Sequence, residues 1–123
     1  MLSLLNLCKN QKDFHLKLNT FFNNNSKGYC CAVNANIVVE CFKKKEYLEI
    51  VKNASFNTCD GINVKRLFNA TYKDKINIYP GPNLFQDLVF KKKYNHFFLG
   101  GQNHVLEGLK TELQKGNHTI SNN

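Results

Sequence analysis

Asp60 is the residue of this 123-residue chain that is best placed to act as a chemical base. It follows the short stretch Phe56–Cys59 and precedes Gly61, a pattern typical of a buried strand that ends in a functional loop. A carboxylate in that place can accept a proton from an attacking hydroxyl group. An Asp-Gly pair is also an ordinary turn, so the rest of the chain has to decide between a base and a turn.

Asparagine and glycine residues follow the other apolar runs of the chain. Asn34 comes directly after Tyr29–Val33, where its side chain can either cap the next helix or contact a ligand. Gly81 and Gly100–Gly101 follow two further runs, and each is either a tight turn or a place where phosphate oxygens meet backbone N–H groups. Their spacing matches no phosphate-loop or dinucleotide fingerprint. As a set, these residues predict hydrogen bonding to a sugar or a nucleotide.

Histidine and cysteine residues give no specific indication of a metal site. His96 and His104 flank the last apolar run and are either a base or phosphate ligand, or packing and surface residues. The five cysteines are an odd number without a Cys-x-x-Cys pair, which is typical of reduced thiols in the cytosol. A zinc site would need four well-spaced ligands. We therefore expect neither a metal ion nor another cofactor.

The elements that would position these residues follow from hydrophobic periodicity. Apolar runs of strand length alternate with segments of helical spacing, which predicts an α/β fold with a mostly parallel sheet and right-handed crossover helices. Because the carboxyl ends of parallel strands meet at one edge, the residues that follow the strands would share a rim. The predicted strands are Tyr29–Val33, Phe56–Cys59, Ile76–Tyr79 and His96–Leu99. The predicted helices cover residues 12–22, 35–42, 46–52, 62–68 and 84–89, and a last helix begins at Asn103.

The chain has the length of one domain, and its formal net charge of +8 favours an anionic partner. Nucleic acid, a membrane surface and a phosphorylated small molecule all fit that charge. The lysines are spread over Lys43–Lys45, Lys73–Lys75 and Lys91–Lys93, where solvated helix ends explain most of them. No recognition helix or aromatic RNA-binding motif accompanies them, so we expect no nucleic-acid partner. The apolar stretch Met1–Leu7 is too short for a signal sequence or a membrane span, which favours a soluble, cytoplasmic chain.

Five short motifs follow one another between residues 29 and 113. They are Asn34-Ala-Asn-Ile-Val, Lys45-Glu-Tyr-Leu-Glu-Ile, Asp60-Gly-Ile, Gly81-Pro-Asn-Leu-Phe and Phe97-Phe-Leu-Gly-Gly. In order and approximate spacing this pattern resembles the WecB/TagA/CpsF glycosyltransferases. That family includes the N-acetylmannosaminyltransferases of teichoic-acid and enterobacterial common antigen synthesis.

The resemblance implies a single, truncated glycosyltransferase domain over residues 1–123 with a Rossmann-like fold. It implies transfer of N-acetylmannosamine or a similar hexose from a UDP-sugar donor to a polyprenyl-diphosphate-linked acceptor, with inversion and without a metal. Such an acceptor would place the chain peripherally on the inner face of the membrane. The family's general base falls on Asp60, and its active-site asparagine falls on Asn34. The candidate substrate-binding residues are Asn34, Gly61, Gly81, Asn83, Gly100 and Gly101.

The chain also departs from the family pattern. The family's Thr-Pro is Ala32-Val33 here, its Arg aligns with Ile78, and its Gly-x-Asp motif reads Gly81-Pro82-Asn83. The family's second half, with its Gly-x-Pro-x-Gln-Glu motif and later strands, has no counterpart in these residues. An incomplete sheet would expose an edge and apolar surface, so we expect self-association. Three hypotheses stay open: a truncated or split glycosyltransferase, a non-catalytic remnant, and a small basic protein that binds nucleic acid.

Overall fold

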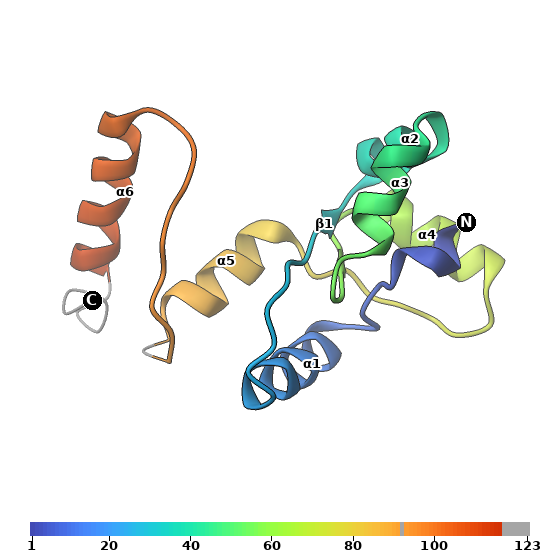
Figure 1. Ribbon diagram of the computed structural model, residues 1–123, viewed down its shortest axis with the longest axis horizontal. Helices are drawn as coiled ribbons and strands as arrows, with labels where there is room; N and C mark the ends of the chain where they lie inside the picture. The colour runs from blue at the N-terminus through green and yellow to red at the C-terminus, as the bar shows by residue number, and fades with distance from the viewer. Residues whose placement is uncertain (92, 117–123) are drawn as a thin grey trace. The chain divides into compact units, whose positions relative to one another are not determined.

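The computed structural model describes residues 1–91 and 93–116, which belong to two compact units, Met1–Gly81 and Pro82–Asn123. The described chain is mixed α/β: it is mostly helical, and its sheet consists of two parallel strands (Figure 1). The elements of the first unit are η1 (Leu2–Leu5), α1 (Gln11–Asn23), β1 (Ala32–Val33), α2 (Ala35–Lys43), α3 (Lys45–Lys52), β2 (Thr58–Cys59) and α4 (Ile62–Thr71). Helix α5 (Gly81–Val89) begins at the last residue of the first unit, and α6 covers Asn103–Gly116.

The predicted helices of the first unit are all present, and two of them, α1 and α2, are capped by a side chain at their start. Asn10 caps α1 by accepting the N–H of Asp13, and the Asp13 carboxylate accepts the N–H of Lys9, both at 2.8 Å. Asn34 caps α2 in the same way, since its Oδ1 accepts the N–H of Ile37 at 3.0 Å. The capping role predicted for Asn34 is therefore confirmed.

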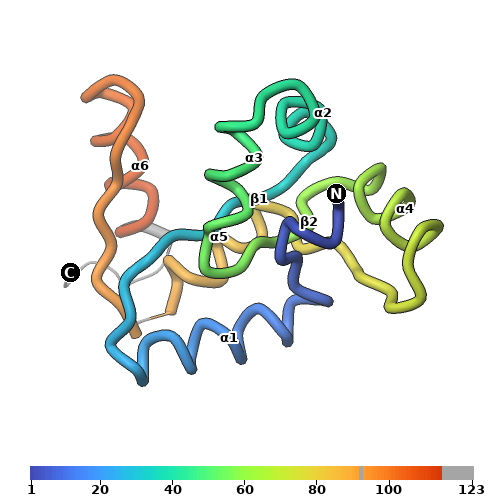
Figure 2. Tube along the Cα trace, turned by 45° about the vertical axis from the view of Figure 1, so that its right-hand side comes forward, coloured from blue at the N-terminus to red at the C-terminus, as the bar shows by residue number. Residues whose placement is uncertain are grey.

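The two strands pair in parallel, with Ala32 opposite Thr58 and Val33 opposite Cys59. In Figures 1 and 2, α1 lies on one side of this sheet and the α2–α3 pair on the other. Backbone hydrogen bonds of 2.9 to 3.0 Å run along the ladder from Ser55 to Tyr29, from Thr58 to Cys31 and from Asp60 to Val33. The predicted pairing is present, although each strand is shorter than the apolar run that contains it.

Two other predictions of strands were wrong for the described residues. Ile76–Tyr79 lies beside β2, but its backbone makes one hydrogen bond with that strand, from the N–H of Tyr79 to the carbonyl of Cys59 at 2.7 Å. His96–Leu99 has no backbone hydrogen bond to another described residue. A strand needs a hydrogen-bonded neighbour as well as the right side chains, so an apolar run alone is not sufficient. The described residues thus show a mixed α/β fold with a two-stranded parallel sheet, and the Rossmann-like sheet expected from the sequence stays a prediction.

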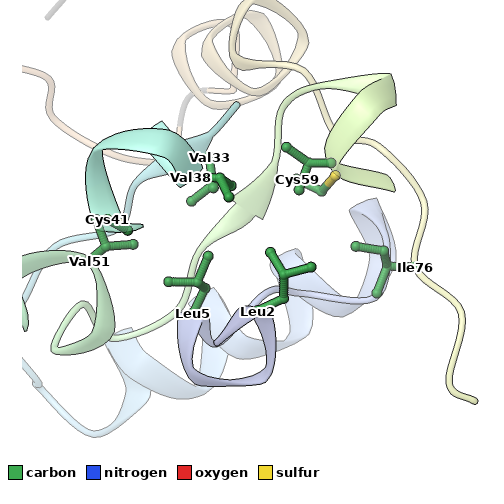
Figure 3. Close-up of a cluster of buried hydrophobic side chains, with 9 residues drawn as sticks. Leu2, Leu5, Val33, Val38, Cys41, Val51, Cys59 and Ile76 are labelled. Atoms are coloured by element: carbon green, nitrogen blue, oxygen red, sulfur yellow. The ribbon is translucent and has the colours of Figure 1, made fainter. Parts of the chain in front are cut away.

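The core of the first unit lies between η1, the sheet, α2 and α3 (Figure 3). Val33 from β1 and Cys59 from β2 are at most 1% exposed. Leu2, Leu5, Val38, Cys41, Val51, Val64 and Ile76 complete this cluster. The apolar stretch at the start of the chain is therefore part of the core, where it packs with the sheet, α2 and α3.

The second unit packs the ring of Phe98 between Phe85 and His96, with ring centroids 5.8 and 6.4 Å apart. Phe97 and Leu99, which alternate with these residues, are 89% and 92% exposed. Gly100 and Gly101 follow with φ angles of 112° and 73°, which L-residues with side chains rarely adopt. The turn conformation by itself explains why glycine stands at both positions.

Candidate active site

The parallel pairing of β1 and β2 brings Asn34 and Asp60 to the same edge of the sheet. Each is the first residue after its strand, and the N–H of Asp60 donates to the carbonyl of Val33 at 2.9 Å. The carboxyl ends of parallel strands are the usual place for a ligand in an α/β protein. The structure therefore places Asn34 and Asp60 together, as the sequence predicted.

The Asp60 side chain is half-buried and is held by one strong contact. Its Oδ1 accepts the backbone N–H of Gly81 at 2.5 Å. Hydrogen bonds to a carboxylate are stronger than those between neutral groups. The Oδ2 atom has no hydrogen-bond partner within the part of the chain that the structure describes. The carboxylate is thus oriented through one oxygen, while the other is available to accept a proton.

Gly61 lies against Asn34 and Gly81 lies against Asp60. A Cβ atom built on Gly61 would be 3.8 Å from the Cα and Cβ atoms of Asn34. A Cβ atom on Gly81 would be 3.6 Å from Oδ1 of Asp60. These are ordinary van der Waals separations, and Gly61 has a φ angle of −130° that any residue can adopt. The four predicted residues of the first unit form one group, and alanine would fit at either glycine.

Two helices of the first unit start at this group of residues. Helix α2 begins directly after Asn34 and α4 directly after Gly61, and no side chain caps α4. The first N–H groups of a helix lack partners within the helix and carry the positive end of its dipole. Such ends attract phosphate and other anions. The edge therefore combines a carboxylate with nearby groups that favour a negatively charged ligand.

Cys59 precedes Asp60, and its surroundings do not favour a nucleophile. The side chain is 1% exposed and its Sγ donates to the carbonyl of Gly61 at 3.5 Å. Burial raises the pKa of the Cys59 thiol above its ordinary value. The group stays protonated near neutral pH, so Asp60 is the better candidate for chemistry at this edge.

The other candidate residues belong to the second unit. Asn83 is in the first turn of α5, and Gly100 and Gly101 form the turn before α6. His104 is exposed at the start of α6, while the Nε2 atom of His96 is buried without a hydrogen-bond partner among the described residues. The substrate-binding role of Asn83, Gly100 and Gly101 stays a prediction.

Asn57 is important for the site, and sequence reasoning assigned it no role. Its side chain is fully buried. Its Oδ1 accepts the N–H of Cys31 at 2.8 Å, and its Nδ2 donates to the carbonyls of Leu5 at 2.6 Å and Val51 at 3.0 Å. A polar residue inside the apolar run Phe56–Cys59 was the available indication, because such a residue has to be satisfied internally. Asn57 holds β2, and hence Asp60, in register with β1.

Residues 1–91 and 93–116 contain neither a grouped set of metal ligands nor a membrane-spanning helix. No three His, Cys, Asp or Glu side chains of these residues are grouped so that they could hold a metal ion. None of their helices is both long and apolar enough to cross a bilayer.

Comparison with known proteins identifies one family. The glycosyl transferase WecG/TagA/CpsF family matches residues 6–121. N-acetylglucosaminyldiphosphoundecaprenol N-acetyl-beta-D-mannosaminyltransferases from Staphylococcus aureus strains NCTC 8325 / PS 47 and COL are each 30% identical to the chain over 109 residues. The alignment covers 85% of this chain and 43% of each relative. The chain therefore spans less than half of the length of these relatives.

Proposed function

Because the chain belongs to the WecG/TagA/CpsF glycosyltransferase family, we propose that its first unit carries the catalytic base of a sugar transfer. The donor is a UDP-sugar that carries N-acetylmannosamine or a similar hexose. The acceptor is a sugar on a polyprenyl diphosphate, in keeping with the N-acetylglucosaminyldiphosphoundecaprenol in the name of the relatives. The observation that carries this proposal is the Asp60 carboxylate, oriented by Gly81 beside Asn34 at the end of the sheet.

In the proposed reaction, Asp60 removes the proton from the acceptor hydroxyl as its oxygen attacks the anomeric carbon of the donor. The new C–O bond forms as the bond from that carbon to the diphosphate breaks, and UDP leaves with the bonding electrons. The proton ends on Oδ2 of Asp60, and attack opposite the leaving group inverts the configuration. Gly61 and the starts of α2 and α4 offer N–H groups to the negatively charged diphosphate, while the N–H of Gly81 holds Asp60.

The rest of the expected fold is part of this proposal. We infer that the complete domain has a Rossmann-like sheet, of which β1 and β2 are two strands, and that Asn83, Gly100 and Gly101 contribute to the substrate pocket. Since the chain spans 43% of its relatives, activity depends on residues that correspond to the remainder. The acceptor lipid would place the working enzyme peripherally at the inner face of the membrane.

A non-catalytic protein is the second candidate, and Ile78 favours it. This residue stands where the family pattern has an arginine, so a positive charge near the donor is lost. Without it, the two helix starts would carry more of the interaction with the diphosphate.

Calorimetric titration with UDP-N-acetylmannosamine tests the proposal and separates the two candidates. We expect saturable heat for the chain, and the same affinity for Asp74→Asn, which changes an exposed carboxylate of the same unit. A matched assay would measure transfer by a fusion of this chain to the part of the Staphylococcus aureus relative that it does not cover. If neither the chain nor the fusion gives saturable heat with UDP-N-acetylmannosamine, the non-catalytic candidate is favoured.

A further inference from the structure

Tyr79 is anchored in the first unit by its ring and by its hydroxyl group. The side chain is 3% exposed, and the ring meets that of Phe14 edge-on at 5.6 Å. The hydroxyl oxygen lies 2.9 Å from Nε2 of His15, within hydrogen-bond distance. Phe14 and His15 are neighbours on α1. The helix on one side of the sheet therefore fixes the position of Tyr79.

Two hydrogen bonds align Tyr79 and Gly81 with the end of β2. The N–H of Tyr79 donates to the carbonyl of Cys59 at 2.7 Å. Two residues later, the N–H of Gly81 donates to Oδ1 of Asp60 at 2.5 Å. The backbone at residue 79 is thus attached to β2, and the backbone at residue 81 holds the carboxylate that follows it.

Pro80 makes the connection between these two bonds stiff. Its ring fixes its own φ angle, and it favours an extended conformation for the residue before it. It also has no N–H that could compete for the Asp60 oxygen. A displacement of Tyr79 is therefore transmitted to the N–H of Gly81.

From this geometry we propose that Tyr79 and His15 are positioning residues for Asp60, acting through Pro80 and Gly81. The inference rests on the proposed function, in which Asp60 is the base. The hydrogen bond between His15 and Tyr79 determines how far the Tyr79 ring is buried. The ring sets the place of the Gly81 N–H, and that N–H turns Oδ2 of Asp60 toward the acceptor hydroxyl. Neither side chain touches the substrate.

Hydrogen exchange of the Gly81 amide, followed by NMR, measures the last step of this chain of contacts. In Tyr79→Phe and in His15→Ala we expect exchange at Gly81 to accelerate roughly tenfold, as for loss of one charge-assisted hydrogen bond. The amide of Asp60, which donates to Val33 in the strand ladder, should exchange as before. His15→Gln should restore part of the protection, because its amide can again bind the Tyr79 hydroxyl.

Tyr72→Phe is the matched control, since the Tyr72 hydroxyl accepts the N–H of Ser3 at 3.1 Å elsewhere in the first unit. It should leave exchange at Gly81 unchanged. Unchanged protection of Gly81 in both Tyr79→Phe and His15→Ala would overturn the proposal. Equal acceleration at Gly81, Asp60 and Thr58 would also overturn it, because the pair would then only hold the fold. Should Tyr79→Phe fail to fold, the His15 variants decide the question.

The exchange experiment needs no substrate, so it can succeed even if the sugar-nucleotide titration shows no binding. In the fusion that carries out transfer, a second readout applies to the same variants. Turnover should fall several-fold, and the affinity for the donor should stay the same, because the orientation of the base changes while the donor contacts remain. A loss of donor affinity with normal turnover would contradict a positioning role.

Discussion

The two units of the chain contain apolar runs of the same kind, and the two runs that form strands among the described residues both belong to the first unit. Tyr29–Val33 and Phe56–Cys59 pair through a backbone ladder. The polar residue of the second run, Asn57, makes hydrogen bonds with both its side-chain oxygen and its side-chain nitrogen. In the described part of the second unit, His96–Leu99 has no backbone hydrogen-bond partner, and Phe97 and Leu99 are about nine-tenths exposed. An apolar run identifies a segment that could form a strand, but the segment becomes a strand only when a neighbouring backbone hydrogen-bonds to it. An ordered edge for chemistry therefore exists in the first unit.

Replacement of the proposed base is the strongest way to break this contrast. Asp60→Asn should lower turnover of the fusion by roughly 10²-fold or more, because the amide cannot accept the acceptor proton. His96→Ala and His104→Ala, in the second unit, should change turnover by much less. Steady-state transfer assays compare the three variants at equal folded concentration. Equal losses of turnover for Asp60→Asn and His96→Ala would contradict the assignment of the catalytic base to the first unit.

Asn57→Ala tests whether the buried amide is what orders the first unit. The change leaves the Cys31 N–H and the Leu5 carbonyl without their partner, while the Val51 carbonyl still accepts the N–H of Ala54 at 3.3 Å. We expect the free energy of unfolding to fall by about 2 kcal/mol or more, since each of the two unsatisfied buried groups costs about 1 kcal/mol or more. Urea denaturation followed by circular dichroism gives this value. Asn63→Ala, at an exposed position of α4, is the control and should differ little from the wild type.

Removal of the exposed apolar side chains of Phe97 and Leu99 tests whether the second unit depends on them for its stability. The double change Phe97→Ser and Leu99→Ser should alter the free energy of unfolding by less than about 0.5 kcal/mol, as for most surface positions. It should also shift the chain toward a monomer if these side chains cause the expected self-association. Analytical ultracentrifugation over a concentration series measures that shift. A large loss of stability would show that the two side chains are packed in solution.

A small, pH-dependent effect is expected at the start of α1. Burial by itself raises the pKa of Asp13, but the N–H of Lys9 and the charge of Lys17 outweigh it and hold that pKa below its ordinary value. The stabilisation is present above the unfolded pKa of about 4 and is lost as the pH falls through the lower folded value. Asp13→Asn should cost about 0.5 kcal/mol at pH 7, because the group is near solvent. Thermal unfolding at a series of pH values should show this difference disappear in acid.

Local features made the helices predictable, and non-local ones limited the rest. Asn34 and its following apolar stripe are sufficient to start α2, so both the helix and the cap could be predicted. The shared edge of Asn34 and Asp60 followed from the rule for parallel strands and is present. The contact from Gly81 to Asp60 spans 21 residues and depends on how Ile76–Tyr79 lies against β2. Periodicity contains no information about that placement, and it gave no sign that Asn57 joins three segments.

The bonds of Asn57 also set the order in which the site can assemble. Its side chain reaches Val51 six residues away, Cys31 at 26 residues and Leu5 at 52 residues. Contacts of long sequence separation form slowly, because they close large loops. The edge that carries Asp60 therefore reaches its final structure only after the first few residues of the chain have packed against β2. A purification tag or deletion within Leu2–Leu5 would delay or prevent that step, although these residues lie far in sequence from the proposed base.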